Sequence, residues 1–435
     1  MSAAIEPVRV VLAGAGAFGR SLLARRRRLP WLHVVAVVEP DSAAAARARA
    51  MLADTGAAVV ATLDEFGSPA DVLVEATGHV EAAAGHALAA LQRDWHLVLV
   101  SKELDVTVGP ELAARFAERG KVCTPVDGDQ PSLLMQLVGW ARALGLELLA
   151  AGKASEHDFV LDDDGSLSWR DRRVDAGALL DVLAAERGPS VRDGLPARHR
   201  YLVHHGLPRR TVADLCEMGV VANALALSPD RPDLHAPLAH PTELADLFQH
   251  REHGGLLGAG ARIDVFNALR RRGEMSFAGG VFVTVATDDD ATWQMLADKG
   301  HVVARNGRAA MIANPRHLLG VEAPLNILLA ARDSRATVDI RPRPVVTLVA
   351  IARNDLPAGT HLEISDPHHH QIGLVHGELR ASAGVTDLCP YYLCADRRLA
   401  RPVAAGQPIG FADFADPPAP LAFGLLRAQA ERFAI

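Results

Sequence analysis

A glycine-rich turn between a strand and a helix places the tightest constraint on how this chain can fold. Residues 8–12 are apolar and rich in β-branched side chains, as expected for a buried strand. They lead into the turn Gly14-Ala15-Gly16-Ala17-Phe18-Gly19, and residues 20–28 then have the pattern of a helix. Strand, glycine turn and helix in this order are typical of a Rossmann dinucleotide-binding unit. A similar turn in an unrelated α/β fold is the alternative.

Each glycine of the turn has its own task in such a unit. Gly14 permits the tight turn, Gly16 lets the backbone approach a pyrophosphate, and Gly19 lets the helix pack closely on the strand. The helix N-terminus supplies N–H donors to the phosphates. Ala17 and Phe18 complete the turn, so we include them with the three glycines as candidate cofactor-binding residues.

A carboxylate follows the second predicted strand at the expected distance from the turn. The apolar run 34–38 ends at Glu39, which lies twenty residues after Gly19. A carboxylate at this position accepts hydrogen bonds from the adenosine ribose and repels a 2′-phosphate. The sequence therefore predicts NAD as the cofactor, with NADP as the other possibility.

The alternation of strands and helices continues through the first 150 residues. The strand at 72–78 ends in Thr77 and Gly78, and a helix is predicted over 80–91. The strand at 97–100 is followed by Ser101 and Lys102, and the next helix is predicted over 111–119. Ligands of a parallel sheet gather at the carboxyl ends of its strands, so these four residues are candidate cofactor contacts.

Lysine is rare in this chain, which has only Lys102, Lys121, Lys153 and Lys299. The chain uses arginine in preference to lysine at most basic positions. A lysine that remains is therefore expected to have a role that arginine cannot fill, such as proton transfer. Lys102 directly follows a predicted buried strand, so we expect it to be catalytic as well as cofactor-binding. A surface lysine is the alternative.

The middle of the chain adds further candidate catalytic residues. Asp129 precedes a helix predicted over 133–144, where it either caps that helix or binds or activates a hydroxylated substrate. A strand predicted over 147–150 ends at Gly152 and Lys153, repeating the pattern of a lysine at a strand end. Residues 214–223 are predicted to be helical, with Glu217 facing the site. Two lysines and an acidic loop suit alcohol dehydrogenation, in which a base removes the proton and a cation stabilises the alkoxide.

The last hundred residues have a different pattern. A strand is predicted over 345–352, and short strands with Pro/Gly turns continue to about residue 411, which indicates a small β-rich module. Several histidines lie close together in it, at positions 361, 368–370 and 376. Consecutive histidines on a strand point to opposite faces, so a solvent-facing loop is favoured and a divalent metal stays uncertain.

The composition indicates which classes of partner and which cell compartment to expect. The formal net charge of −7 argues against nucleic acid, which needs a concentrated basic surface. The basic run at 25–28 falls at a predicted helix end, where it complements the helix dipole. Four cysteines do not make a disulfide framework, no apolar run reaches membrane-spanning length, and no secretory signal is visible. We therefore expect a cytoplasmic protein with no membrane partner.

Several motifs together carry a family resemblance. The glycine turn, Glu75-Ala76-Thr77-Gly78 and Val100-Ser101-Lys102 resemble the nucleotide domain of homoserine dehydrogenase. A closer similarity is to homoserine dehydrogenase-like proteins with a C-terminal SAF domain. That similarity rests on five further motifs: Asp127-Gly128-Asp129-Gln130-Pro131, Ala151-Gly152-Lys153, Asp214-Leu215-Cys216-Glu217, the stretch 317–322, and Ala352 to Gly359.

The resemblance implies an organisation and an activity. The expected fold class is α/β, with a doubly wound Rossmann sheet over 1–150 and an α+β substrate and oligomerisation domain over 151–340. A small β-rich SAF-like (β-clip) module follows over 341–415, and then a tail over 416–435. The resemblance also implies that Lys102 contacts both cofactor and substrate, and that the protein is a homo-oligomer.

The chain departs from true homoserine dehydrogenases, which have an Asn-Gly-Thr turn and a second catalytic lysine where this chain has other residues. SAF-like modules occur in proteins that handle polyhydroxylated compounds, which favours a polyol, sugar acid or sugar phosphate and a place in carbohydrate metabolism. We expect hydride transfer to or from such a substrate. The alternatives are a redox-neutral lyase or isomerase that retains NAD, with or without a metal, and a non-catalytic NAD-binding protein.

Overall fold

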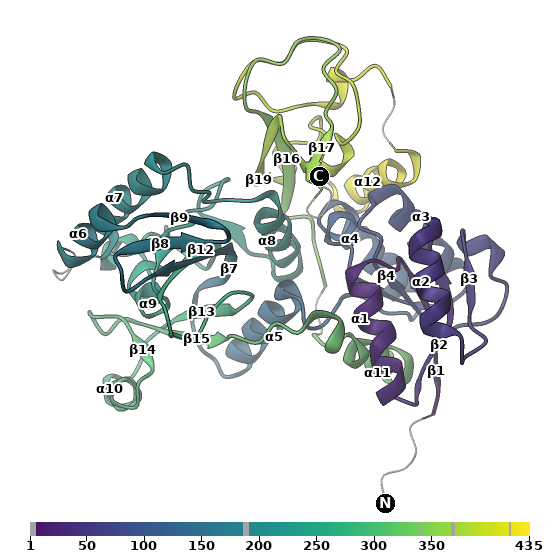
Figure 1. Cartoon of the computed structure of the whole chain (residues 1–435), viewed down its shortest axis with the longest axis horizontal. Coiled ribbons are helices and arrows are strands. Elements are labelled where there is room, and N and C mark those ends of the chain that lie inside the picture. The colour runs from purple at the N-terminus through teal and green to yellow at the C-terminus, as the bar shows by residue number, and fades with distance from the viewer. Residues whose placement is uncertain (1–5, 186–190, 339–340, 367–369, 417–418) are drawn as a thin grey trace, which may run out of the picture.

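The predicted strand, glycine turn and helix open a six-stranded parallel sheet in the computed structural model (Figure 1). The structure describes residues 6–185, 191–338, 341–366, 370–416 and 419–435. The strand order β3-β2-β1-β4-β5-β6 is that of a Rossmann domain, so the predicted α/β class is confirmed. The strands are β1 (Val8–Ala13), β2 (Leu32–Val38), β3 (Ala58–Val60), β4 (Val72–Glu75), β5 (His96–Leu99) and β6 (Cys123–Pro125).

Helices from both ends of the chain cover this sheet. The N-terminal part supplies α1 (Ala17–Arg25), α2 (Ser42–Leu52), α3 (Val80–Gln92) and α4 (Lys102–Glu118). A later helix, α11 (Ala323–Asp333), returns to pack on β1, β4 and β5. The C-terminal helix α12 (Pro420–Phe433) packs on α3 and α4. Segments from three distant parts of the sequence therefore build the Rossmann half of the molecule.

The prediction that the helix after β5 begins near residue 111 is wrong. Helix α4 begins at Lys102 and contains Pro110 in its interior. A proline there removes one backbone hydrogen bond, which is why the sequence favoured a break. Residues 106–112 of α4 are all buried, so tertiary packing stabilises the helix through the proline.

The second sheet has the strand order β10-β12-β7-β13-β15-β14, with β8, β9 and β11 joined at its sides. Its strands are β7 (Leu148–Leu161), β8 (Ser166–Trp169), β9 (Arg172–Asp175), β10 (Ser228–Pro229), β11 (Leu238–Ala239), β12 (Arg262–Arg271), β13 (Val281–Ala286), β14 (Val302–Val303) and β15 (Ala309–Asn314). Its helices are α5 (Gln130–Ala143), α6 (Gly177–Ala185), α7 (Val191–His204), α8 (Val212–Leu225), α9 (Leu244–Leu247) and α10 (Asp290–Asp298).

Both faces of this sheet are covered. Ala151 of β7 and Val283 of β13 belong to one core with apolar side chains of α5 and α8. Ala150 and Phe282, one residue away on the same strands, belong to another core with Leu247 of α9. Because side chains alternate along a strand, these two cores lie on opposite faces.

The prediction that a strand ends at Gly152 and Lys153 is also wrong. Strand β7 runs on to Leu161, so Lys153 lies in mid-strand, and its side chain is only 1% exposed. Lys153, Ser155 and His157 are all buried. The sequence pattern fails here because Lys153 and Ser155 have buried polar partners, and His157 packs on the rings of Phe159 and Trp169.

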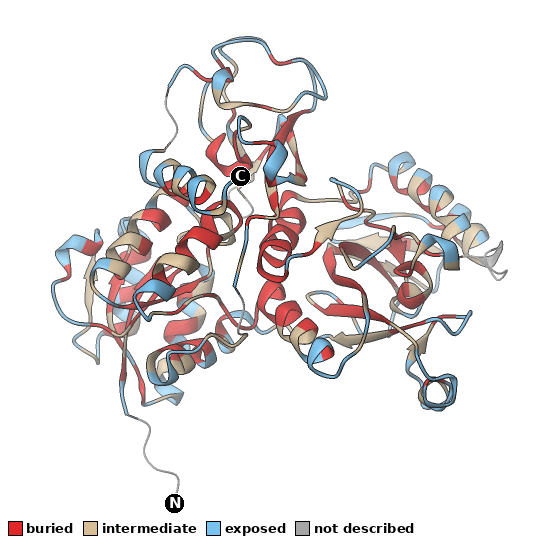
Figure 2. Ribbon diagram, turned by 180° about the vertical axis from the view of Figure 1, so that it is seen from behind, coloured by how far each residue is buried: buried red, intermediate tan, exposed pale blue. Residues whose placement is uncertain are grey.

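Helix α8 lies at the centre of the molecule (Figure 2). All of its residues are buried, and it packs against α4, α5, β7 and β12. It also packs against β16 (Val346–Ala352) and β19 (Val375–Ala381), which form an antiparallel pair near the C-terminus. A helix that is apolar nearly all round needs neighbours on every side, and these elements supply them.

The C-terminal β-rich segment is short-stranded, as the sequence indicates. Besides β16 and β19 it contains β17 (Ile364–Asp366) and β18 (Gln371–Ile372). Asn223 of α8 anchors it, because its side-chain oxygen accepts hydrogen bonds from the N–H groups of Val345 at 2.8 Å and Val346 at 2.9 Å. Pro367, His368 and His369 of the histidine run lie outside the described residues. Within the described ranges, no helix is long and apolar enough to cross a membrane.

A half-buried carboxyl on α4 makes the stability of the Rossmann half depend on pH. Burial raises the pKa of Asp105 to about 7. An unfolded chain binds this proton more weakly, so the free energy of unfolding falls as pH rises from about 4 to about 7. We expect Asp105→Asn to remove that loss and to stabilise the protein at pH 8 by about 1–3 kcal/mol, with little effect at pH 4.

Thermal unfolding of both proteins across this pH range measures the effect. Asp54→Asn is the control, because the Asp54 carboxyl is exposed and pairs with Arg26 at the surface. Parallel melting curves for Asp105→Asn and the unmodified chain at every pH would contradict the prediction.

Candidate active site

The glycine turn forms one wall of a cavity of about 880 Å³ at the carboxyl ends of β1, β2 and β4. Gly14 has a φ of +95°, and a Cβ on it would lie 2.5 Å from the backbone oxygen of Ala76. A Cβ on Gly16 would meet no atom within 4 Å, so the backbone there is open to a ligand. A Cβ on Gly19 would collide with the carbonyl of Gly14. The three glycines thus allow the tight turn, the open backbone and the close helix packing that a pyrophosphate-binding turn requires.

The N-terminus of α1 faces this turn with free donors. Gly16 is its N-cap residue, and no side chain caps the helix there. The first turn also contains no acidic residue. Ala17 and Phe18 form this first turn and line the adjoining cavity. An uncapped helix N-terminus with no nearby carboxylate on its first turn is suited to hold a phosphate.

Glu39 lines the same cavity and is held beside the glycine turn. Its Oε2 accepts a hydrogen bond from the N–H of Ala15 at 2.8 Å, and its Oε1 accepts one from the N–H of Asp41 at 3.0 Å. The carboxylate therefore keeps one orientation beside the turn, at the place where an adenosine ribose lies in a Rossmann domain.

A second cavity, of about 640 Å³, continues from the first. The two share Gly16, Ala76 and Thr77 as lining residues. Beyond them the second cavity is lined by Gly78, Ser101, Lys102, Asp129 and Glu217. It therefore brings predicted cofactor contacts together with three of the four predicted catalytic residues. Ser101 Oγ accepts a hydrogen bond from the N–H of Gly78 at 2.7 Å, which ties the ends of β4 and β5 together. We call the two cavities together the cleft.

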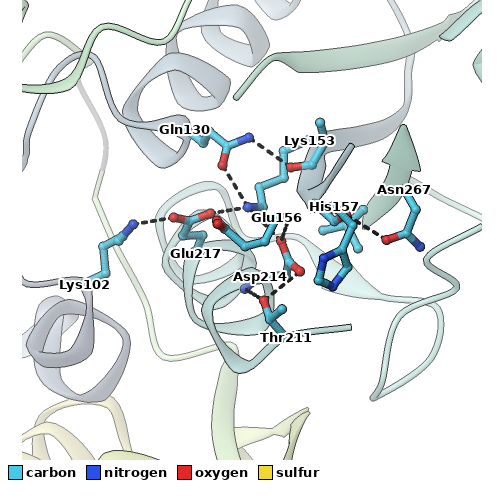
Figure 3. A network of polar contacts seen from close by, with 12 residues as sticks. Lys102, Gln130, Lys153, Glu156, His157, Thr211, Asp214, Glu217 and Asn267 are labelled. Atoms are coloured by element: carbon cyan, nitrogen blue, oxygen red, sulfur yellow. Dashed lines mark hydrogen bonds and ion pairs between the residues drawn. The ribbon is translucent and has the colours of Figure 1, made fainter. Parts of the chain in front are cut away.

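Glu217 lies at the centre of a polar network at the end of the cleft (Figure 3). It comes from α8 and accepts hydrogen bonds from Lys102 of α4 on one oxygen and from Lys153 of β7 on the other. Lys102 Nζ also pairs with Asp129 Oδ2 at 3.2 Å. Asp129 caps α5 by accepting from the N–H of Gln130 at 2.9 Å. Its capping role and its place in the site are therefore compatible.

Lys153 lies behind Glu217 and does not line the cleft. Its ammonium contacts Gln130 Oε1 at 2.8 Å and Asp214 Oδ1 at 3.0 Å, in addition to Glu217. Asp214 in turn accepts from the hydroxyl of Thr211 at 2.8 Å. The structure therefore separates the two predicted lysines, with Lys102 at the cleft and Lys153 enclosed by protein.

The charges of this network stabilise one another. Burial by itself would lower the pKa of Lys102, but Asp129 and Glu217 outweigh it and raise the pKa well above the usual value. Burial alone would lower the pKa of Lys153, and Glu217 and Asp214 reverse this as well. Burial opposes ionisation of Glu217, yet the two lysines hold its pKa below the usual range. At neutral pH the network therefore contains two ammonium groups and an ionised Glu217.

Three carboxylates at this end of the cleft, Glu156, Asp214 and Glu217, lie within 4.8 Å of one another. Such a group resembles a divalent-cation site. The ammonium of Lys153, however, already contacts Asp214 and Glu217. A metal ion would have to displace it, so the donor set present fits an ammonium better than a metal.

The sequence alone did not identify several residues of the site. Gln130 and Asp214 fall in motifs that carry the family resemblance, but nothing local shows that they bind Lys153. His317 and Tyr392 also line the cleft. Of the histidine run, His370 lines the cleft as well, and its Nδ1 lies 3.4 Å from Glu103 Oε1. These residues lie far apart in the sequence, so no local sequence pattern predicts that they meet in one site.

Two family models match the chain, one in each half of the site. A model described as the homoserine dehydrogenase NAD-binding domain matches residues 14–123, and one described as the catalytic domain of the oxidoreductase DRL matches residues 211–323. The chain therefore carries the two parts of an NAD(P)-dependent, dehydrogenase-like enzyme. The resemblance to homoserine dehydrogenase is confirmed for the nucleotide domain, while the SAF-like module stays a prediction. No curated protein matches the chain.

Solved structures with similarity to the chain include NAD(P)-linked enzymes. GenD2 from gentamicin A biosynthesis, in complex with NAD, is 17% identical, with 78% of this chain and 90% of that chain covered and a TM-score of 0.35. Dihydrodipicolinate reductase from Paenisporosarcina sp. TG-14 is 11% identical, with 77% and 96% covered and a TM-score of 0.33. The WlbA dehydrogenase from Bordetella pertussis is 20% identical, with a TM-score of 0.27. That match covers 34% of this chain and 46% of the WlbA chain, so it spans less than half of that enzyme.

The position of Glu39 leads to a test of cofactor preference. Glu39→Gln keeps an oxygen that can accept from Ala15 but removes the charge that repels a 2′-phosphate. We expect the preference for NAD over NADP to fall by about tenfold, as for the loss of one charge interaction of about 1.4 kcal/mol. Binding titrations with both cofactors measure it.

Asp54→Asn makes the same charge change on the surface of the Rossmann half and serves as the control. If both variants kept the cofactor preference of the unmodified chain, Glu39 would not be the residue that distinguishes NAD from NADP at the ribose.

Proposed function

We propose that this protein interconverts a hydroxyl and a carbonyl group on a small polyhydroxylated molecule, with NAD as the preferred cofactor. The substrate class is an alcohol, a sugar acid or a sugar phosphate. The observation that carries the proposal is that one continuous cleft joins the pyrophosphate-binding turn to Lys102, Asp129 and Glu217. The bound nicotinamide supplies the hydride chemistry, and the side chains of the cleft handle the substrate oxygen and its proton.

Lys102 is suited to act on that oxygen. An ammonium group has three N–H donors, and within the described parts of the chain Lys102 contacts two carboxylates, Glu217 and Asp129. Its side chain is 28% exposed, so a donor remains available toward the cleft. In the reducing direction the ammonium donates a proton to the carbonyl oxygen as negative charge develops there. In the oxidising direction its neutral form accepts the hydroxyl proton.

Glu217 and Asp129 keep Lys102 charged and oriented. Both carboxylates line the cleft, so each also has access to hydroxyl groups of a substrate. Each hydroxyl group of a polyol both donates and accepts hydrogen bonds. The carboxylates can accept from such groups, and the ammonium beside them can donate to them. This pairing supports a polyhydroxylated substrate over an apolar one.

We assign Lys153 a positioning role and not direct contact with substrate. Its side chain is 1% exposed and it holds Glu217 from the side opposite Lys102. The carboxylate is thereby prevented from turning away from Lys102. Lys153 acts on the reaction through Glu217.

The domain organisation that we propose has three units. Residues 1–150 form the nucleotide unit, to which α11 and α12 add helices and from which α5 extends to pack on the second sheet. Residues 151–340 otherwise form the substrate and oligomerisation unit. Residues 341–415 form an SAF-like module. Its strands β16 and β19 pack on α8, which also carries Glu217, and this supports a role in shaping the site. A homo-oligomeric, cytoplasmic enzyme remains our expectation.

A screen of the full chain tests the function. The protein is first denatured and examined by mass spectrometry for retained nicotinamide, and then supplied with NAD and a panel of polyols, sugar acids and sugar phosphates. Accumulation of reduced cofactor with one of these supports the proposal. Product without net reduced cofactor would replace it with the redox-neutral isomerase or lyase. Cofactor binding without turnover on any compound in either direction would overturn it.

Replacing Lys102 separates catalysis from binding. We expect Lys102→Met to lower kcat by about 100-fold or more, because the proton donor and the charge next to the reacting oxygen are both lost. Steady-state kinetics measure the loss, and a cofactor titration and thermal unfolding show whether the cleft persists. Lys121→Met is the matched control, since Lys121 lies outside the cleft lining. Equal activity of the two variants would exclude Lys102 from the chemistry.

The raised pKa of Lys102 predicts different pH profiles for the two directions. Oxidation needs the neutral amine, which is scarce below a pKa held above its usual value of about 10, so kcat/KM for oxidation rises steadily from pH 7 to about pH 10. Reduction uses the ammonium and stays level over this range. A plateau in the oxidation profile near pH 7 would contradict the assignment of Lys102 as the group that titrates.

A further inference from the structure

A second, separate cavity of about 550 Å³ lies in the half of the molecule that contains the second sheet. Its walls come from α7, from Arg209, from residues 231–238 and from residues 251–256. None of its lining residues lines the cleft. Helix α7 lies at the end of the molecule far from the Rossmann sheet (Figure 1). We call this cavity the arginine pocket.

The lining of the arginine pocket has a marked excess of positive charge. Four arginines line it, and Asp193 is the one carboxylate among the lining residues. Asp193 is exposed at the start of α7, where water surrounds it. The remaining wall is largely apolar and includes Leu195, Pro196, Leu202, Pro237, Leu238 and Leu256.

Three of the four arginines have partners within the protein. Arg251 pairs with Asp230, Arg231 pairs with Asp233 at 3.1 Å, and Arg192 donates to the backbone oxygen of Gly255 at 3.1 Å. These contacts hold the three guanidinium groups in place along the wall.

Arg209 differs from the other three. It has no hydrogen bond or ion pair with any residue in the described ranges of the chain. Burial and the neighbouring Arg210 lower the pKa of Arg209 to about 10, although Asp233 partly opposes them. Buried charges normally have an opposite charge beside them, which offsets the loss of hydration. The Arg209 guanidinium is partly removed from water and lies beside another cation, yet it contacts no carboxylate. An anion in the pocket would supply the opposite charge.

His199 is a second unpartnered group in the same wall. Its Nδ1 is buried and has no hydrogen-bond partner among the residues that the structure describes. Burial and the charge of Arg209 lower the pKa of His199, so the ring is neutral at pH 7 and can donate one hydrogen bond. A buried ring nitrogen without a partner, next to an unpaired guanidinium, marks a place where a ligand oxygen would fit in the tautomer that carries the proton on Nδ1.

We propose that the arginine pocket binds a small organic anion with at least two negative charges, a phosphate ester or a polycarboxylate. Its charged group pairs with Arg209 and lies beside His199, since a guanidinium matches the paired oxygens of either group. Its carbon skeleton packs on the leucine and proline side chains of the wall. The volume is in the range that holds a small-molecule ligand. This site is independent of the proposed reaction in the cleft.

Calorimetric titration of the full chain tests the proposal, with pyrophosphate and citrate as probes and sodium chloride to keep the ionic strength constant. NAD is present at saturating concentration, so that the pyrophosphate-binding turn of the cleft is occupied. We expect at least one probe to bind saturably at one site per chain, and the stronger probe tells phosphate from carboxylate chemistry. Arg209→Gln should weaken binding by about tenfold or more, and Arg209→Lys should restore part of it.

Arg200→Gln is the matched control, because Arg200 is exposed on α7 and does not line the pocket. NAD titration of each variant shows whether the fold is kept, and Arg231→Gln replaces Arg209→Gln if the latter does not fold. Failure of both probes to bind saturably at matched ionic strength would overturn the proposal. So would equal weakening by Arg200→Gln and Arg209→Gln, which would indicate general charge attraction only.

Discussion

Glu217 joins the two halves of the molecule through its two carboxylate oxygens. One oxygen accepts from Lys102, which begins a helix of the Rossmann half, and the other accepts from Lys153 in the middle of the second sheet. Removing one member of a buried charge network leaves the others uncompensated, at a cost of about 3–5 kcal/mol. The relative position of the cofactor cleft and the second sheet therefore depends on this carboxylate. The same contact that assembles the site also fixes the charge state of Lys102.

Helix α8 can carry this carboxylate because it has no face toward solvent. Its apolar side chains pack on elements from all parts of the chain, while its three buried polar residues each have partners: Asp214 with Lys153, Glu217 with both lysines, and Asn223 with the backbone of the C-terminal strand. A polar group inside an otherwise apolar interface raises the free energy of the fold unless it has a hydrogen-bond or ion-pair partner. These three residues therefore keep their partners only in a few relative positions of the surrounding elements. This is a physical reason why the β-rich module, although far from Lys102 in sequence, bears on the geometry of the site.

The local features of the fold could be predicted from sequence, and the features that depend on distant contacts could not. The turn from Gly14 to Gly19 and the strand that leads to Glu39 follow from steric rules that act within a few residues, and the structure has both. The continuation of β7 through Lys153 and of α4 through Pro110 depends on partners that are far away in the chain. For the same reason Lys102, Asp129 and Glu217 could each be selected as polar residues beside predicted elements, whereas Gln130 and Asp214 could not be recognised as partners of Lys153.

Two of the four lysines, Lys102 and Lys153, contact Glu217, but the scarcity of lysine does not distinguish their roles. Lys153 has three N–H donors, and three acceptors surround it: Gln130 Oε1, Asp214 Oδ1 and Glu217 Oε2. A planar guanidinium with five donors would leave some of them buried without acceptors, so arginine is excluded here by geometry and not by chemistry. Lys102 has two carboxylate contacts at the edge of a cavity, and its remaining donor has a ligand as its natural acceptor. The complete set of acceptors encloses Lys153, whereas the incomplete set around Lys102 leaves a donor for a ligand of the cleft.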